Sequence, residues 1–284
     1  MGRGVPKSGR RMTKKFLAQQ AGLAYIPKSQ SVVQPEVPNR FSINERFEFL
    51  GDVCKMIARY EQPAMLLVGP GGVGKSFSVI QSLTAAGLKD ATFLANFEVG
   101  LRVNTRKTFK VAKGFCTPRG LYKTLYDSKD SILVMDDMDS ILKDPTSISL
   151  LKGALDSCDK RMITWRSDRE DDEYPNSFLF EGAVIFISNM SVHQMDQAVL
   201  TRTLCVDLSM TSADKVARIR HIASQPSFMP DFSAAAKQDA VDLIAQLKDK
   251  IKQLNLRSLI QTVRIRASAP PAKWKKMADY VLVG

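Results

Sequence analysis

The chain has 284 residues, of which 44% are hydrophobic and 25% charged, the balance of a soluble globular protein able to bury a core. It has no run of about 18 apolar residues, so we expect no membrane-spanning helix. Two histidines and four scattered cysteines, which never form a C-x-x-C pair, argue against a zinc site and for reduced thiols in a cytoplasmic protein. The cysteines are Cys54, Cys116, Cys158 and Cys205.

The first segment is strongly basic and accounts for much of the net charge of +12. No acidic residue precedes Glu36, and prolines recur as far as Pro38, so we predict a flexible basic arm over residues 1–40. Such an arm attracts nucleic acid through counterion release. A solubilising tail is an open alternative, and a transit peptide is a third. The basic residues at its start are Arg3, Lys7, Arg10, Arg11, Lys14 and Lys15.

The next elements alternate between helix and strand. Apolar residues at helical spacing predict a helix from Phe41 to about Tyr60. The apolar run 64–68 predicts a buried parallel strand that leads directly into Gly69. Residues 77–86 predict a helix, which Gly87 would end.

Further strands are expected at 91–94, 132–135, 183–188 and 204–208, and helices at 117–126 and 148–158. This alternation predicts an α/β fold, a three-layer parallel sheet with helices on both faces, over residues 41–210. After Thr211 only helical patterns follow, at 213–223, 234–254 and 256–266. Residues 211–284 are therefore expected to form a small all-helical domain with a basic C-terminal tail.

The strand at 64–68 is followed by a complete G-x-x-x-x-G-K-[ST] motif. Its glycines let backbone N–H groups turn inward around phosphate oxygens, and the next helix directs its N-terminus at them. Lys75 would reach the β- and γ-phosphates of ATP, and the Ser76 hydroxyl would bind Mg²⁺. The expected nucleotide-binding residues are Gly69, Pro70, Gly71, Gly72, Val73, Gly74, Lys75, Ser76 and Phe77.

A second motif is a buried strand, residues 132–135, that runs into Asp136 and Asp137. Asp136 is expected to hold Mg²⁺, directly or through water. Asp137 is expected to orient or deprotonate an attacking water. These motifs predict an ATPase.

The order of these motifs resembles the AAA+ ATPases, a P-loop NTPase family, from about Phe41 to Arg266. The resemblance implies that Asn189 is the sensor-1 residue, Arg202 an arginine finger that completes a neighbouring subunit's site, and Arg257 a sensor-2 residue in a helical lid. AAA+ proteins usually carry Glu as the second acid, and here Asp137 is one methylene shorter, which leaves the hydrolysis rate open.

Two further segments bear on the substrate. Phe115 lies where AAA+ translocases often place an aromatic pore loop, and a core position is an equal alternative. Residues 161–165 and 177–181 predict a β-hairpin around the acidic loop 168–173. That loop would repel phosphate and favours a protein partner or simple solvation over DNA contact.

The sequences of residues 113–137, 148–165 and 186–202 resemble those of small stand-alone AAA+ proteins of phage and prokaryotic genomes. This resemblance implies a cytoplasmic location, which for a phage protein is the cytoplasm of the host. We expect an ATPase that forms a ring or arc and remodels or translocates nucleic acid or a nucleic-acid-bound protein. The alternative is a slowly hydrolysing, ATP-gated DNA-binding switch, such as a helicase loader or target selector. A small-molecule kinase is a third option, which Asn189, Arg202 and Arg257 together disfavour.

Overall fold

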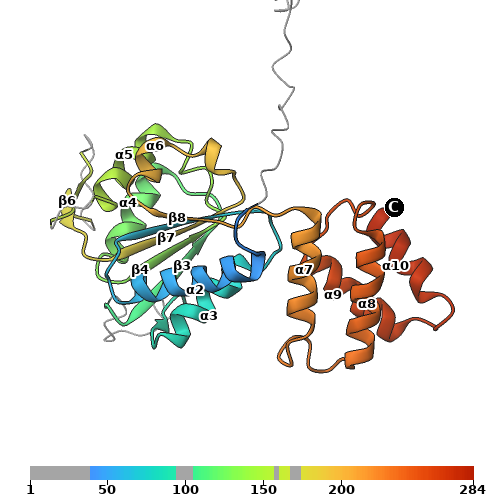
Figure 1. The fold of residues 1–284 in the computed structure, drawn as a ribbon. Coiled ribbons are helices and arrows are strands. Elements are labelled where there is room, and N and C mark those ends of the chain that lie inside the picture. Colours follow the sequence, from blue (N-terminus) through green and yellow to red (C-terminus); the bar gives the residue numbers. More distant parts are fainter. Residues whose placement is uncertain (1–38, 94–104, 157–159, 167–173) are drawn as a thin grey trace, which may run out of the picture. The chain divides into compact units, whose positions relative to one another are not determined.

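The computed structural model describes residues 39–93, 105–156, 160–166 and 174–284 (Figure 1). The predicted basic arm therefore lies outside the described residues, except for Asn39 and Arg40. The acidic hairpin loop, residues 168–173, also lies outside them, as does Cys158.

Six strands form one sheet in the order β2-β3-β4-β7-β1-β8, and all neighbouring pairs are parallel. The predicted three-layer α/β fold is thus confirmed. The strands are β1 (Ala64–Val68), β2 (Lys89–Asp90), β3 (Thr108–Lys113), β4 (Ile132–Asp136), β7 (Ala183–Ser188) and β8 (Leu204–Asp207).

Helices cover both faces of this sheet (Figure 1). Because side chains alternate along a strand, Met65 and Leu67 of β1 join the core under α2 and α3, whereas Leu66 and Val68 join the core under α4 and α5. A strand buried on both faces must be apolar throughout, which is why β1 reads as a continuous apolar run. The helices are α2 (Ile43–Ala58), α3 (Lys75–Ala85), α4 (Pro118–Asp127), α5 (Pro145–Ala154) and the short α6 (Gln197–Leu200), which follows a single 3-10 turn, η2 (Val192–Gln194).

Local sequence fixes where these helices begin. Ser42 and Glu45 form a reciprocal capping box at the start of α2. Thr117 and Asp144 cap α4 and α5, and each is followed by a proline, which suits the first helical position.

The predicted hairpin is confirmed as a two-stranded antiparallel sheet of β5 (Met162–Thr164) and β6 (Ser177–Leu179). It leads through Gly182 into β7.

Only helices follow β8 in the described residues: α7 (Ser212–Ala223), α8 (Ala234–Leu247), α9 (Leu256–Ser268) and α10 (Trp274–Val283). They pack around a core of their own, which includes Ile219, Val241, Ile244 and Leu259. Residues 39–284 form one compact unit, and the division at residue 210 stays a prediction. None of the described helices has the length and apolarity needed to cross a bilayer.

Three expected boundaries were wrong. Of the strand expected at 91–94, the structure describes residues 91–93, and these form no strand, because Thr92 donates from its backbone N and its hydroxyl to the Asp90 carboxylate and turns the chain after β2. The helix expected at 148–158 is α5, which begins three residues earlier and ends at Ala154. The helix expected at 234–254 ends at Leu247, since a turn follows that still buries Ile251 in the same core, which mimics helical periodicity.

Strand β3 and helix α10 were among the elements not foreseen in the sequence. Strand β3, with the sequence TFKVAK, mixes apolar residues with two lysines, and α10 lies in what was expected to be a basic tail. The buried side of α10 carries Trp274, Ala278 and Leu282, at helical spacing.

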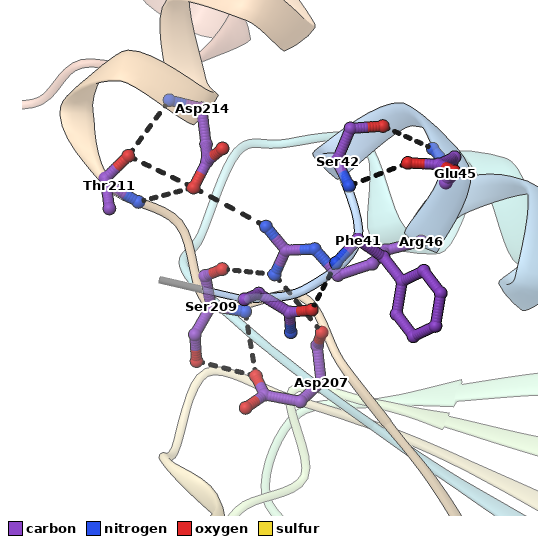
Figure 2. Close-up of polar contacts among 9 residues, drawn as sticks. Phe41, Ser42, Glu45, Arg46, Asp207, Ser209, Thr211 and Asp214 are labelled. Atoms are coloured by element: carbon purple, nitrogen blue, oxygen red, sulfur yellow. Dashed lines mark hydrogen bonds and ion pairs between the residues drawn. The ribbon is translucent and has the colours of Figure 1, made fainter. Parts of the chain in front are cut away.

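A buried arginine joins α2 to the segment between β8 and α7. Arg46 Nη1 lies 2.5 Å from the Ser209 carbonyl oxygen and 3.5 Å from that of Asp207, and Nη2 lies 3.5 Å from Asp214 Oδ2. Figure 2 shows this guanidinium between the connecting segment and the first turn of α7. Asp214 also completes the capping box of α7 with Thr211. One side chain thus fixes the path of the chain from the sheet to the helices.

We expect Arg46→Ala to lower the free energy of unfolding by about 2–4 kcal/mol, because it removes a buried guanidinium and leaves the partly buried carbonyl oxygens of Asp207 and Ser209 and the Asp214 carboxylate without this donor. Urea unfolding measures the change. The matched control is Lys55→Ala on the same helix, whose exposed ion pair with Asp52 is expected to contribute about 0–1 kcal/mol. Equal losses in the two variants would contradict the role of Arg46.

Candidate nucleotide-binding site

The register of three parallel strands brings the motif residues to one edge of the sheet. Val68 pairs with Ser188, and Asp136 pairs with Ile187. The P-loop (residues 69–76) and Asn189 therefore begin at the same level, one residue beyond the Val68–Ser188 pair, and Asp137 follows the Asp136–Ile187 pair, one residue short of that level. Because β7 lies between β4 and β1, Asn189 stands between the two motifs.

The P-loop needs glycine at positions where the chain turns tightly. Gly74 has φ +94° and is the N-cap of α3, which begins at Lys75, two residues before the predicted start. Gly72 has φ +75°, and a Cβ there would lie 3.0 Å from Asn255. The backbone N–H groups in the first turn of α3 have no acceptor within the helix, so they can donate to a bound anion.

Lys75 is buried and makes three hydrogen bonds. Its Nζ donates to the carbonyl oxygens of Gly69 at 2.6 Å and Pro70 at 2.9 Å, and to Asn189 Oδ1 at 2.8 Å. Burial lowers the pKa of Lys75 from its ordinary 10.5 to about 8, opposed by the charges of nearby aspartates, with Asp137 the largest. A phosphate is the ligand that would restore the full charge on this amine.

Asn189 connects Lys75 to the second acid. Its Nδ2 donates to Asp137 Oδ1 at 2.6 Å. Asp137 itself has φ +57°, and its N–H donates to the Ile187 carbonyl oxygen at 3.1 Å. Left-handed conformations at non-glycine residues are uncommon and gather at functional sites. The hydrogen bonds from Lys75 to Asn189 and from Asn189 to Asp137 thus hold the Asp137 carboxylate close to the P-loop.

Ser76 and Asp136 form a pair of oxygen donors. Ser76 Oγ lies 2.8 Å from Asp136 Oδ1, and Asp136 is buried. A hydroxyl and one carboxylate suit Mg²⁺, which keeps several waters and takes its remaining ligands from substrate phosphates. No group of three or more acidic, histidine or cysteine side chains gathers for a metal elsewhere in residues 39–93, 105–156, 160–166 and 174–284. The donor set therefore fits a magnesium ion that arrives with a nucleotide.

One hydrogen bond that supports the position of Asn189 was not predicted from the sequence. Ser188 Oγ donates to Asp139 Oδ1 at 2.6 Å and accepts from the Met190 backbone N at 3.0 Å. This pair fixes the turn that carries Asn189. Asp139 lies three residues after β4, and its partner Ser188 is the last residue of the neighbouring strand β7.

The helix α9 closes the cleft from the other side. Leu256 N donates to the Gly72 carbonyl oxygen at 2.9 Å, and Asn255 caps α9 by accepting from the Arg257 and Ser258 backbone N–H groups. Arg257 therefore lines the same cleft of about 380 Å³ as the P-loop. The cleft is lined by Gly71, Gly72, Gly74, Lys75, Ser76, Phe77, Asp136, Asp137, Asn189, Leu256, Arg257 and Ile260.

Some predicted residues do not line the cleft, among them Gly69, Pro70, Val73, Arg202 and Phe115. Arg202 follows α6, its Nη1 donates to the Ala198 carbonyl oxygen at 3.1 Å, and it does not line the cleft. Phe115 is 83% exposed, so the alternative that it is a core residue was wrong. Val73, in turn, is buried in the core beneath α2 and α3 and contributes only its backbone to the loop.

No protein-family model matches the chain. An Enterobacteria phage T4 protein, described as an uncharacterized 36.7 kDa protein in the nrdC-mobD intergenic region, is 25% identical over 189 residues, covering 61% of this chain and 53% of that protein. The chain thus spans about half the length of the curated relative that it matches.

A solved structure of the Aeropyrum pernix ORC1 protein in complex with DNA is similar with a TM-score of 0.46 and 15% identity, covering 87% of this chain and 66% of that chain. The case for function therefore depends on the geometry of the cleft.

The depressed pKa of Lys75 predicts a pH dependence of stability. Between about pH 8 and about pH 10.5 the unfolded chain holds one proton more at this residue than the folded chain. The free energy of unfolding should therefore rise with pH across this window, by at most about 1.4 kcal/mol per pH unit. Urea unfolding of the unchanged protein and of Lys75→Met measures the difference. Parallel pH profiles for the two proteins would contradict the shift.

Proposed function

We propose that this protein binds ATP with Mg²⁺ and hydrolyses it, as an ATPase of the AAA+ type. The observation that supports this best is the convergence of Lys75, Asn189 and Asp137 with the Ser76–Asp136 pair at one cleft. Phosphoryl transfer to water requires a loop that binds the phosphates, oxygen donors that hold the metal ion and a carboxylate that orients the attacking water.

Each group at the cleft has its own part in this reaction. The P-loop backbone and the N-terminus of α3 bind the phosphates, and Lys75 leaves its carbonyl partners to pair with the γ-phosphate. Asp137 orients the attacking water and accepts its proton, with Asn189 holding the carboxylate in place. Mg²⁺ held by Ser76 and Asp136 would neutralise charge that develops on the phosphates.

We further propose that residues 211–284 act as a lid over the domain 41–210, with Arg257 as the residue that senses the γ-phosphate. Arg202 would serve the site of a neighbouring copy, because it does not line the cleft of its own chain. This requires a ring or arc of subunits. The basic arm, residues 1–40, would bind nucleic acid, or would bring the protein to a nucleic-acid-bound partner.

Lys75→Ala and Asp137→Asn test the ATPase. Lys75→Ala should abolish ATP binding, because the γ-phosphate loses its ammonium. Asp137→Asn preserves shape and suits the left-handed backbone, so it should bind ATP normally while turnover falls by about 10²-fold or more. Fluorescent-nucleotide titration and phosphate release measure the two effects. Unchanged ATPase activity in Lys75→Ala would remove the main claim.

Arg202→Ala should bind ATP but lose about 10³-fold in turnover, by analogy with other arginine fingers. Mixing it with Lys75→Ala should restore part of the activity, since one subunit would supply the intact P-loop and the other the intact arginine. Each variant alone is the control. Failure of the mixture to regain activity would count against a site shared between subunits.

A slowly hydrolysing, ATP-gated DNA-binding switch is the alternative, and the shorter acid Asp137 favours it. Steady-state ATPase rates with and without single-stranded DNA, duplex DNA, RNA and unfolded protein distinguish the two. Stimulated turnover supports the motor, and tight ATP-dependent DNA binding with negligible turnover supports the switch. Deleting residues 1–20 should weaken DNA binding and flatten its salt dependence if the arm contacts nucleic acid.

A further inference from the structure

Both carboxylate oxygens of Asp136 are engaged, and a lysine holds one of them. Oδ1 accepts from Ser76 Oγ, and Oδ2 lies 2.8 Å from Lys113 Nζ. The Asp136 side chain is 5% exposed, whereas that of Lys113 is 61% exposed. A nearly buried acid at the proposed metal position is thus paired with a cation that reaches it from solvent.

The strand register explains this pairing. Lys113 is the last residue of β3 and lies directly beside Asp136, the last residue of β4. Paired residues on neighbouring strands direct their side chains to the same face of the sheet. The long, flexible stem of lysine places its ammonium on the carboxylate, and the same stem allows it to swing away into water.

We propose that Lys113 competes with Mg²⁺ for Asp136. This rests on the proposed function, in which Ser76 and Asp136 hold the cation. A magnesium ion must approach oxygen ligands to about 2.0–2.1 Å, and an ammonium on the same carboxylate repels it and occupies one lone-pair direction. Lys113 therefore supplies the counter-charge for Asp136 until a cation binds, and withdraws from the carboxylate when it does.

The withdrawal of Lys113 acts on the loop that carries Phe115. Gly114 follows with φ +93°, and among the described residues beyond its two chain neighbours no atom lies within 4 Å of the point that a Cβ would occupy, so its backbone is sterically free on that side. Phe115 is exposed, and Thr117 caps α4 shortly after the strand ends. The ion pair is thus one attachment of a short loop, which is also held where Cys116 packs against the core, and cation binding at Asp136 would release the ion pair.

The test is the Mg²⁺ dependence of fluorescent ADP binding, titrated at a series of Mg²⁺ concentrations. Lys113→Ala should lower the half-saturating Mg²⁺ concentration by roughly fivefold, the size expected for loss of a partly exposed ion pair. Lys113→Arg keeps the charge and should stay near the unchanged protein. Lys110→Ala is the matched control on the same strand, because its Nζ donates to the Asp127 carbonyl oxygen and not to the metal site.

Hydrogen exchange of the 110–118 segment gives a second measurement. Adding Mg²⁺ and ADP should speed exchange there in the unchanged protein and leave Lys113→Ala, which has already lost the attachment, without a change. An unchanged or raised Mg²⁺ requirement in Lys113→Ala would overturn the competition, as would identical exchange responses in both proteins. If the unchanged protein binds no nucleotide at any Mg²⁺ concentration, the proposed function falls, and this inference with it.

Discussion

The site depends on the alignment of β4, β7 and β1. Their register sets the P-loop, Asn189 and Asp137 at neighbouring points of one sheet edge. Slipping β7 by one residue would reverse every side chain on it, placing Ser188 where Asn189 now joins Lys75 to Asp137. The two cores on either face prevent this slip, because alternate residues of each strand are buried in different clusters. Packing far from the cleft thus maintains hydrogen bonds within it.

Two short motifs of the site could be predicted from adjacent residues, and Asn189 and Arg257 were expected from the family resemblance, whereas the contacts of Lys113 and Asn255 were not predicted. The P-loop and the Asp136–Asp137 pair are short motifs whose chemistry depends on adjacent residues. Lys113 and Asn255 belong to the same site through strand register and through the docking of α9, for which the sequence offers no periodic signal. Strand β3 was missed because its six residues, TFKVAK, do not alternate regularly and include two lysines, so that nothing distinguishes them from a loop.

The P-loop contacts the residues that follow β8 at two points, at its first residue and near its middle. Gly69 lies against Leu208, whose N–H donates to the Val68 carbonyl oxygen, and Gly72 lies against Asn255, whose neighbour Leu256 donates to the Gly72 carbonyl oxygen. Arg46 holds the intervening path of the chain through backbone carbonyl oxygens (Figure 2). A change in the P-loop would therefore reach the helices by two routes at once, which favours a concerted movement of α7 and α9 over independent ones.

The left-handed backbone at Asp137 limits how this site can evolve. Aspartate and asparagine adopt that conformation more readily than longer side chains, because their polar atoms bond close to the main chain. Exchanging Asp137 for the glutamate usual in AAA+ proteins would therefore change the backbone preference as well as the reach of the carboxylate. A lineage that keeps this turn would adjust the rate of the proposed ATPase through neighbours of the acid, with Asn189 and the Ser188–Asp139 pair as the nearest. The backbone conformation of this one residue would then set limits on that proposed rate.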